Sequence, residues 1–315
     1  MASAKTPSNS GRPGDARAGE PVRLMSDELR ARIYLRGREL YRDLPWRHTQ
    51  DPYQIWVSEA MLQQTQVSRV DGRWQSWLER FPSVVALAQA SSADVLDEWQ
   101  GLGYNRRALA LWRAAQHMVE LHGGEVPRET RELVALPGIG PATAAGIRAF
   151  AFDAPGVYLE TNVRSVFLHE LYPGEEGVPD RALVPAVEAA CPAAAAGVAG
   201  CDVPMTPRSW YYALLDYGAY LKQTLPNPSR RSSGHTRQSK FEGSHRQKRA
   251  GVVRMLLAVR TSEPGGLTVA DVSRGLTEVE LAAGREAIDE AHARVILDEL
   301  VSEGFCRKAG KLWLA

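Results

Sequence analysis

The sequence predicts an all-α protein that ends in a small winged-helix-like module. Apolar residues recur at helical spacing through most of the chain, and no strand pattern of convincing length precedes the last hundred residues. The composition, with 44% hydrophobic and 24% charged residues in a chain of 315, is typical of a globular protein with a sizeable core. We expect the first 225 residues to form a bundle of roughly ten short helices.

The bulk properties exclude several classes of protein. The net charge of +1 does not by itself indicate a nucleic-acid partner, so such binding would depend on where the charges lie. Three irregularly spaced cysteines are too few for a disulfide framework and fit a reducing cytoplasm. No apolar run approaches the roughly 18 residues of a membrane span, and the first 20 residues lack the apolar segment of a secretory signal. We expect a soluble, cytoplasmic protein.

Composition divides the chain into four parts. Residues 1–22 are rich in Ser, Gly, Pro, Ala and Arg without periodicity, which predicts a disordered tail. Residues 23–221 carry the helical patterns of the main domain, and residues 249–315 form the C-terminal module. Between them, residues 222–248 are predicted to be a basic loop, suited to phosphate contact or simply solvated. Its cations, counted to the start of the next helix, are Lys222, Arg230, Arg231, Arg237, Lys240, Arg246, Lys248 and Arg249, against the acid Glu242.

Local signals place the first helices. A helix is expected from Ser26, with Ile33 on its apolar face, and a second one at about 53–67, where Asp51 can cap and Pro52 can open it. Further helices are expected at 70–81, 92–99, 106–122, 127–136 and 142–152.

The helix at 53–67 carries a carboxylate on its apolar stripe. Ile55 and Leu62 share a face with Glu59, at steps of four and three, and Gln66 follows at a further step of four. Partial burial raises the pKa of a carboxyl toward the range of a general acid at neutral pH. The same spacing also fits a glutamate at the edge of an apolar face with no chemical role.

A glycine-rich turn at 136–140, LPGIG, joins two of the expected helices. Gly138 and Gly140 permit backbone conformations that other residues resist, and Pro141 suits the first turn of the next helix. The free N–H groups of such a turn form an anion site that binds phosphate without reading sequence. The hairpin is therefore predicted to contact DNA.

Five sequence blocks stand out in order along the chain: LPWR at 44–47, WVSEAMLQQTQV at 56–67, GLGY at 101–104, LPGIG at 136–140 with TA at 143–144, and NVRSV at 162–166. Together they resemble the helix-hairpin-helix (HhH-GPD) glycosylase superfamily of base excision repair, and within it the MutY-type adenine glycosylases. The resemblance spans about 40–219 and implies a two-lobed helical fold.

The resemblance implies roles for individual residues. Glu59 matches the acid that protonates the leaving adenine, and Gln63 and Gln64 match glutamines that wedge into the base stack. Tyr104 matches an aromatic that intercalates beside the opposing base. Chemically, a base leaves more readily once its ring nitrogen is protonated, and the developing charge on the sugar requires a nearby anion.

The second carboxylate departs from the family pattern. The family places an aspartate just before the Asn-Val step, and this chain has Glu160 ahead of Asn162. Glutamate retains the charge but adds a methylene, so its carboxylate reaches the sugar only from a backbone set slightly farther back. Two interpretations stay open: Glu160 stabilises the sugar cation, or it only caps the following helix.

Two further departures concern cofactor and chemistry. Ala142 occupies the position at which endonuclease III-like relatives carry a lysine nucleophile, so no Schiff base forms there and a monofunctional glycosylase is favoured. No cysteine occurs at 220–251, where the family's four-cysteine iron-sulfur loop is expected, and three cysteines do not supply four thiolates. We predict no cofactor and no metal.

The chain ends about 70 residues after that point, too soon for an oxidised-guanine recognition domain of the MutY type. A helix at 249–259, a second from Thr268 with Asp271 in a capping box, and a third at 285–303 ended by Gly304 are expected instead. A hairpin turning at 309–310 follows. This order favours a winged-helix module that contacts DNA or protein.

We therefore expect a monomeric glycosylase that acts on double-stranded DNA with a mispaired or damaged base, cytoplasmic, and nucleoid-associated in a bacterium. Adenine opposite guanine or 8-oxoguanine is the favoured target. The alternatives are excision of thymine, uracil, hypoxanthine or an alkylated purine, and a binding protein that recognises damaged DNA without catalysis. The residues assigned are Glu59 and Glu160 as catalytic, and Gln63, Gln64, Tyr104, Gly138, Gly140, Asn162, Arg230 and Arg231 as DNA-binding.

Overall fold

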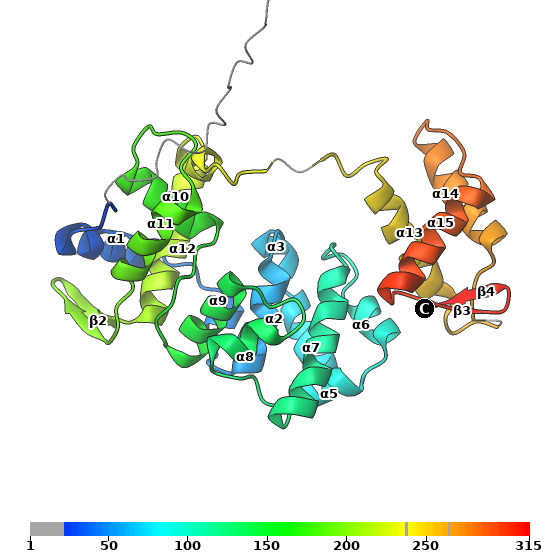
Figure 1. The fold of residues 1–315 in the computed structure, drawn as a ribbon, viewed down its shortest axis with the longest axis horizontal. Helices are drawn as coiled ribbons and strands as arrows, with labels where there is room; N and C mark the ends of the chain where they lie inside the picture. The colour runs from blue at the N-terminus through cyan, green and yellow to red at the C-terminus, as the bar shows by residue number, and fades with distance from the viewer. Residues whose placement is uncertain (1–21, 237–238, 264) are drawn as a thin grey trace, which may run out of the picture. The chain divides into compact units, whose positions relative to one another are not determined.

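A computed structural model describes residues 22–236, 239–263 and 265–315. They form two compact units: unit 1 holds the described residues of Met1–Asp43 and Arg148–Arg237, and unit 2 those of Leu44–Ile147 and Gln238–Ala315. Residues 1–21 of the predicted tail lie outside the described residues, and Arg237 of the predicted basic loop lies outside them as well. Both units are mostly helical (Figure 1), which confirms the predicted class.

Unit 1 is built around α12, which packs against α1 and α10, and Figure 1 shows α10, α11 and α12 side by side. Glycines allow both contacts, because a Cβ atom on Gly37 would lie 2.3 Å from the backbone oxygen of Ala213 and one on Gly218 would lie 2.2 Å from that of Asn162. The elements of this unit are α1 (Asp27–Glu39), the end of α9 (Pro141–Phe152), α10 (Thr161–Leu171), α11 (Asp180–Ala190), β1 (Ala196–Val198), β2 (Cys201–Met205), α12 (Pro207–Thr224) and the 3-10 helix η2 (Pro228–Arg231).

Unit 2 has a tryptophan-rich core. Trp56, Trp77 and Trp99 are fully buried, and the rings of the last two lie edge to face with centroids 5.5 Å apart. Its elements are η1 (Pro45–Arg47), α2 (Pro52–Leu62), α3 (Val67–Val70), α4 (Arg73–Arg80), α5 (Val84–Gln89), α6 (Ser92–Glu98), α7 (Arg106–His122), α8 (Thr130–Ala135), the start of α9, α13 (His245–Val259), α14 (Val269–Ala282), α15 (Glu290–Glu303), β3 (Arg307–Ala309) and β4 (Leu312–Leu314).

Several of the predicted helix boundaries are confirmed. The Ser26 side chain accepts from the backbone of α1, and Asp51 accepts from the first N–H groups of α2. Thr268 and Asp271 form the expected capping box, and Gly304 ends α15 with a φ of 82°. The C-terminal hairpin is also present, with β3 antiparallel to β4.

Five predictions of secondary structure were wrong. Helix α2 ends at Leu62 instead of continuing to 67, and the expected helix at 70–81 is interrupted at Gly72, whose φ is 79°. The antiparallel hairpin β1–β2 lies in a region expected to be helical. Helix α15 begins at Glu290 instead of 285, with Asp289 as its N-cap, and Arg285 forms an ion pair with Glu280. The two ends of the predicted basic loop are helical, as the bounds of α12 and α13 show.

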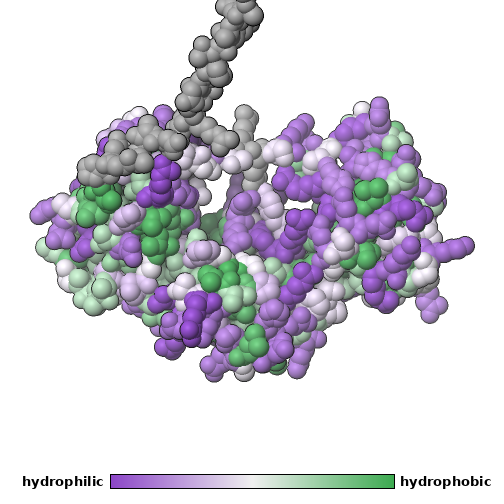
Figure 2. All heavy atoms as spheres, in the orientation of Figure 1, coloured by the Kyte–Doolittle hydropathy of each residue, from purple (hydrophilic) through white to green (hydrophobic). Residues whose placement is uncertain are grey.

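No helix within the described ranges is long and apolar enough to cross a membrane. On the face in Figure 2, polar residues cover most of the surface and apolar residues form separate patches.

Candidate nucleic-acid interface

Helix α2 positions Glu59 as the sequence predicts. Ile55, one turn earlier on the same stripe, is 1% exposed, and the neighbouring Trp56 and Val57 are buried as well. Glu59 itself is half-buried, so its carboxylate lies at the edge of the apolar core of unit 2. An acid in this setting is partly desolvated, which is what a general acid near neutral pH requires.

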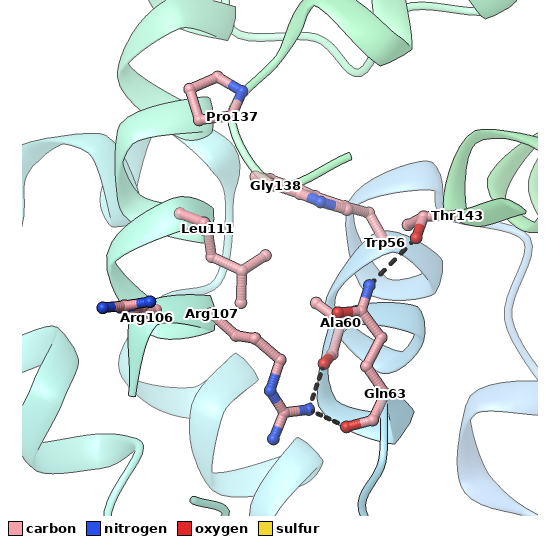
Figure 3. Close-up of a pocket in the computed structure, with 10 residues that line it drawn as sticks. Trp56, Ala60, Gln63, Arg106, Arg107, Leu111, Pro137, Gly138 and Thr143 are labelled. Atoms are coloured by element: carbon pink, nitrogen blue, oxygen red, sulfur yellow. Dashed lines mark hydrogen bonds between the residues drawn. The ribbon is translucent and has the colours of Figure 1, made fainter. Parts of the chain in front are cut away.

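The two glutamines that follow α2 differ in environment. Gln63 is half-buried, and its Nε2 atom donates to the hydroxyl of Thr143 in α9 at 3.0 Å (Figure 3). Gln64 is exposed, with a φ of 55°. Of the predicted pair, Gln64 is therefore the side chain at the tip of the turn, and Gln63 links that turn to the helix of the hairpin.

Tyr104 lies in a second strained turn. Its φ is 51° and its side chain is 37% exposed, while Gly101 and Gly103 before it also have positive φ. In the described part of the chain, Gln64, Tyr104 and Asp153 are the non-glycine residues with positive φ. Such backbone costs free energy and persists only where surrounding contacts hold it, which is common at ligand-contacting sites.

The contacts that hold both turns come from Arg107, at the start of α7. Its Nη1 atom donates to the backbone oxygens of Ala60 (2.7 Å), Met61 (3.0 Å) and Gln63 (2.6 Å), at the end of α2. Its Nη2 atom donates to the hydroxyl of Thr65 at 2.9 Å and to the oxygen of Gly103 at 3.1 Å.

The same guanidinium also faces aromatic rings. Its Cζ atom lies 5.4 Å from the ring centroid of Tyr104 and 5.2 Å from that of Trp99. Burial lowers the pKa of Arg107 to about 10, and the group stays charged at neutral pH. Sequence reasoning missed this residue, because nothing in the local pattern separates it from Arg106 beside it.

The helix-hairpin-helix consists of α8, the turn at 136–140 and α9. Gly138 has a φ of 77°, and a Cβ atom there would lie 2.6 Å from the Cβ of Ala110 in α7. The turn therefore needs glycine at this position, both for its conformation and for its contact with α7. The expectation was wrong for Gly140, whose φ is not positive; a Cβ there would meet no described atom within 4 Å.

A small pocket of about 210 Å³ lies beside this hairpin within unit 2. It is formed by the end of α2, the first turns of α7 and the glycine turn, and Figure 3 shows Arg107, Gln63 and Thr143 meeting there. Its lining residues are Trp56, Ala60, Gln63, Arg106, Arg107, Ala110, Leu111, Pro137, Gly138 and Thr143.

Glu160, in unit 1, is the N-cap of α10. Its Oε1 atom accepts from the backbone N–H groups of Asn162 at 2.6 Å and Val163 at 3.0 Å. Its Oε2 atom receives only a long contact from the Asn162 amide, at 3.4 Å. Glu160 therefore does cap α10, and because capping occupies one oxygen, the other oxygen stays compatible with the second interpretation.

Glu160 lies in a buried environment that also holds hydrogen-bond donors and cations. Burial raises the pKa of its carboxyl, and the N–H donors, Lys222 of α12 and Arg164 of α10 partly oppose this shift. Burial likewise lowers the pKa of Lys222. Beside the carboxylate, the side-chain oxygen of Asn162 is buried and has no hydrogen-bond partner among the described residues. An orphaned acceptor of this kind indicates a place where water or a ligand completes the bonding.

The two predicted DNA-binding arginines in η2 differ. Arg230 is exposed and suited to phosphate contact. Arg231 donates to the backbone oxygens of Tyr172 (2.6 Å) and Leu168 (2.8 Å), so its guanidinium satisfies carbonyls at the end of α10.

The donor set does not fit an iron-sulfur cluster. Cys191, Cys201 and Cys306 are the only cysteines of the chain. All three are free thiols, and they lie just after α11, at the start of β2 and between α15 and β3. The described residues include no group of three or more His, Cys, Asp or Glu side chains placed to hold a metal ion.

Part of this chain is similar to known proteins. Residues 57–190 match the family described as HhH-GPD superfamily base excision DNA repair protein. The adenine DNA glycosylase of Mycolicibacterium smegmatis is 47% identical over 126 residues, which are 40% of this chain and 43% of that protein. The human adenine DNA glycosylase is 40% identical over 134 residues, which are 40% of this chain and 24% of that protein. The matched segment thus spans less than half the length of these relatives.

Two solved structures are more distantly similar. A thermostable thymine-DNA glycosylase is 24% identical, with a TM-score of 0.48, over 60% of this chain and 82% of that one. An endonuclease III in a non-covalent complex with DNA is 15% identical, with a TM-score of 0.49, over 62% of this chain and 86% of that one.

Proposed function

We propose, from the membership of residues 57–190 in the HhH-GPD superfamily of base excision DNA repair proteins, that this protein is a monofunctional DNA glycosylase that removes adenine from a mispair. Relatives that match 40% of this chain at 47% and 46% identity are adenine DNA glycosylases. The observation that carries the proposal is the convergence, within unit 2, of Arg107 on two strained turns that end in Gln64 and Tyr104.

The chemistry assigns separate roles to the two carboxyl groups. Glu59 protonates a ring nitrogen of the flipped adenine, so that the base leaves as a neutral molecule. Glu160 stabilises the positive charge that develops on the sugar, through the oxygen that capping leaves available. Water then adds to the sugar carbon, the proton that it releases returns to the Glu59 carboxylate, and an abasic site remains. Each role can be tested separately, because each residue is held by its own unit.

DNA binding in this proposal uses elements with little sequence specificity. The N-terminus of α9 and the exposed glycine turn contact a phosphate, and Arg230 contacts another. Gln64 and Tyr104 fill the gap that base extrusion leaves. We propose a monomer that acts on double-stranded DNA in the cytoplasm without an iron-sulfur cluster.

The test is base removal from a labelled duplex with adenine opposite 8-oxoguanine, followed by alkali, under single-turnover conditions. Wild-type protein should give a cleaved strand, and Glu59→Gln should slow its formation by a factor of about 10²–10⁴. Absence of product with wild-type protein would contradict the proposal. Duplexes with thymine, uracil, hypoxanthine or an alkylated purine then identify another target base, and tight binding with intact bases throughout identifies a binding protein.

A further inference from the structure

The guanidinium of Arg246, in α13, lies between two exposed aromatic rings. Its Cζ atom is 5.6 Å from the ring centroid of Tyr104 and 5.4 Å from that of Phe241. Tyr104 is 37% exposed and Phe241 is 48% exposed. Among the described residues, Tyr41 is the other aromatic side chain with comparable exposure. Two of these three rings therefore flank one cation.

Both sides of this arrangement are fixed by contacts within unit 2. The ring of Tyr104 also contacts Arg107, whose Cζ atom lies 5.4 Å from its centroid. Phe241 precedes the N-cap of α13, and its backbone oxygen accepts from Ser244, at 3.1 Å from the amide nitrogen and 2.6 Å from the hydroxyl oxygen. Arg246 donates to the oxygen of Ser239 at 3.3 Å.

A network around Glu303 ties the C-terminal helices to α7. Arg106 binds both carboxylate oxygens of Glu303, at 2.8 and 2.7 Å, and Arg249 binds one of them at 2.7 Å. Arg113 donates to the backbone oxygen of Glu303 at 2.7 Å. The position of Arg246 over Tyr104 is therefore supported independently of their own contact.

Exposed aromatics beside a planar cation have the chemistry of a surface for nucleobases. Stacking of a base on an aromatic ring is tolerant of sequence, and arginine adds a second flat, charged face. Most N–H groups of Arg246 are not used by its bond to Ser239, and they suit acceptors on the edge of a purine. Burial in a core does not explain this set, because Tyr104 and Phe241 remain 37% and 48% exposed.

We propose that Tyr104, Arg246 and Phe241 form a stacking site for the unpaired base opposite the flipped nucleotide, so that the C-terminal part of the chain takes part in reading that base. This proposal rests on the proposed function, because the opposing base is unpaired only when its partner nucleotide is flipped out for base removal. It gives the C-terminal segment a role that the HhH-GPD domain at 57–190 does not contain.

The test uses the full-length protein and a duplex with 2-aminopurine opposite a tetrahydrofuran abasic analogue. Quenching of 2-aminopurine reports stacking, and titration gives the Kd. Phe241→Ala should weaken binding about tenfold, equivalent to about 1.4 kcal/mol, and reduce the quenching. Arg246→Lys should have a similar effect, because lysine retains the charge but lacks the planar face. Tyr41→Ala is the matched control for loss of an exposed aromatic and should bind as wild type.

Two results would overturn the proposal. One is wild-type binding and quenching by Phe241→Ala. The other is wild-type behaviour of Arg246→Lys with a salt-dependent loss in Arg246→Ala, which would reduce Arg246 to a phosphate contact. Phe241→Leu provides a second variant if alanine lowers the melting temperature. Because the analogue duplex undergoes no base removal, failure of the glycosylase assay leaves this readout intact, and the two proposals fail separately.

Discussion

The Nη1 atom of Arg107 lies 2.6 Å from the backbone oxygen of Gln63, at the residue where α2 ends. The guanidinium thereby takes up carbonyls that the end of a helix leaves unpaired. It also reaches the turn before Tyr104 through the oxygen of Gly103. One side chain thus sets the conformation of both turns that are proposed to enter DNA.

Replacing Arg107 should loosen both turns together. Arg107→Lys supplies a single ammonium where several carbonyls need donors, so we expect a loss of about 1–3 kcal/mol in stability and faster amide hydrogen exchange at 63–66 and 101–104. Glycosylase activity should fall with it. Arg106→Lys is the matched control, because the neighbouring Arg106 contacts Glu303. Equal exchange rates in wild type and Arg107→Lys would refute this role.

The glycines of the hairpin should respond differently to alanine. Gly138→Ala places a Cβ atom 2.6 Å from that of Ala110 at a positive φ, and the conformation alone costs about 1–2 kcal/mol. Gly140→Ala meets no described atom within 4 Å, so the melting temperature should change little. If the turn approaches a phosphate, Gly140→Ala should still weaken DNA binding. Unchanged binding by a folded Gly140→Ala would remove Gly140 from the interface.

Substitutions at Glu160 should separate charge from capping. Glu160→Gln keeps an oxygen that accepts from Asn162 and Val163, so folding should be retained, while the loss of charge should slow base removal about 10²–10³-fold. Glu160→Asp keeps the charge and should retain more activity than Glu160→Gln. Melting temperatures and single-turnover rates distinguish the two effects. A Gln variant as active as wild type would leave Glu160 with the capping role alone.

Acid should weaken the attachment of the C-terminal helices. Hydrogen bonding to Arg106, followed by the contacts with Arg249, lowers the pKa of Glu303 to about 2. Because this folded-state pKa lies below the ordinary value of about 4.3, the stabilisation is present above that value and is lost as the pH falls toward about 2. Between pH 6 and 2, the free energy of unfolding should fall less steeply in Glu303→Gln than in wild type, because the variant lacks this one titrating carboxyl group. Glu290→Gln, at the exposed start of the same helix, should titrate like wild type.

The absence of an amine at Ala142 predicts the type of product. Ala142 is exposed at the first turn of α9, where a lysine would meet the sugar in relatives with lyase activity. The wild-type protein should leave the strand intact until alkali is added, and borohydride should trap no protein–DNA adduct. A trapped adduct would point to another amine, and Lys222→Gln would then test the half-buried lysine near Glu160.

Local signals predicted much of the fold. Asp51 and Thr268 mark helix starts that need only their own neighbours, and Gly304 marks an end in the same way. The end of α2 was not predictable, because no glycine or proline follows Leu62 and the helix is stopped by contacts with Arg107 and Thr143 from elsewhere in unit 2. The hairpin β1–β2 likewise depends on cross-strand pairing, and the local pattern of an alanine-rich segment does not predict strands.

The candidate site was predicted where a residue type carries the chemistry, as for Glu59 and Tyr104. The roles of individual arginines were not predictable, because the chain has many arginines and their roles depend on their positions in the fold. Arg107, Arg246 and Arg231 have different partners, and only the fold distinguishes them. The capping of α10 by Glu160 was one of two open interpretations, and the structure supports it without excluding the other.

Gly218 should tolerate substitution poorly, because of its close contact with the start of α10. A side chain there would press on the backbone oxygen of Asn162 at 2.2 Å and displace the first turn of α10, which Glu160 caps. In an unbiased screen for loss of function, substitutions at Gly218 should therefore be recovered alongside those at Glu160, although Gly218 contributes no functional group. A position that looks like inert packing in the sequence would then tolerate substitution as poorly as one that carries a functional group.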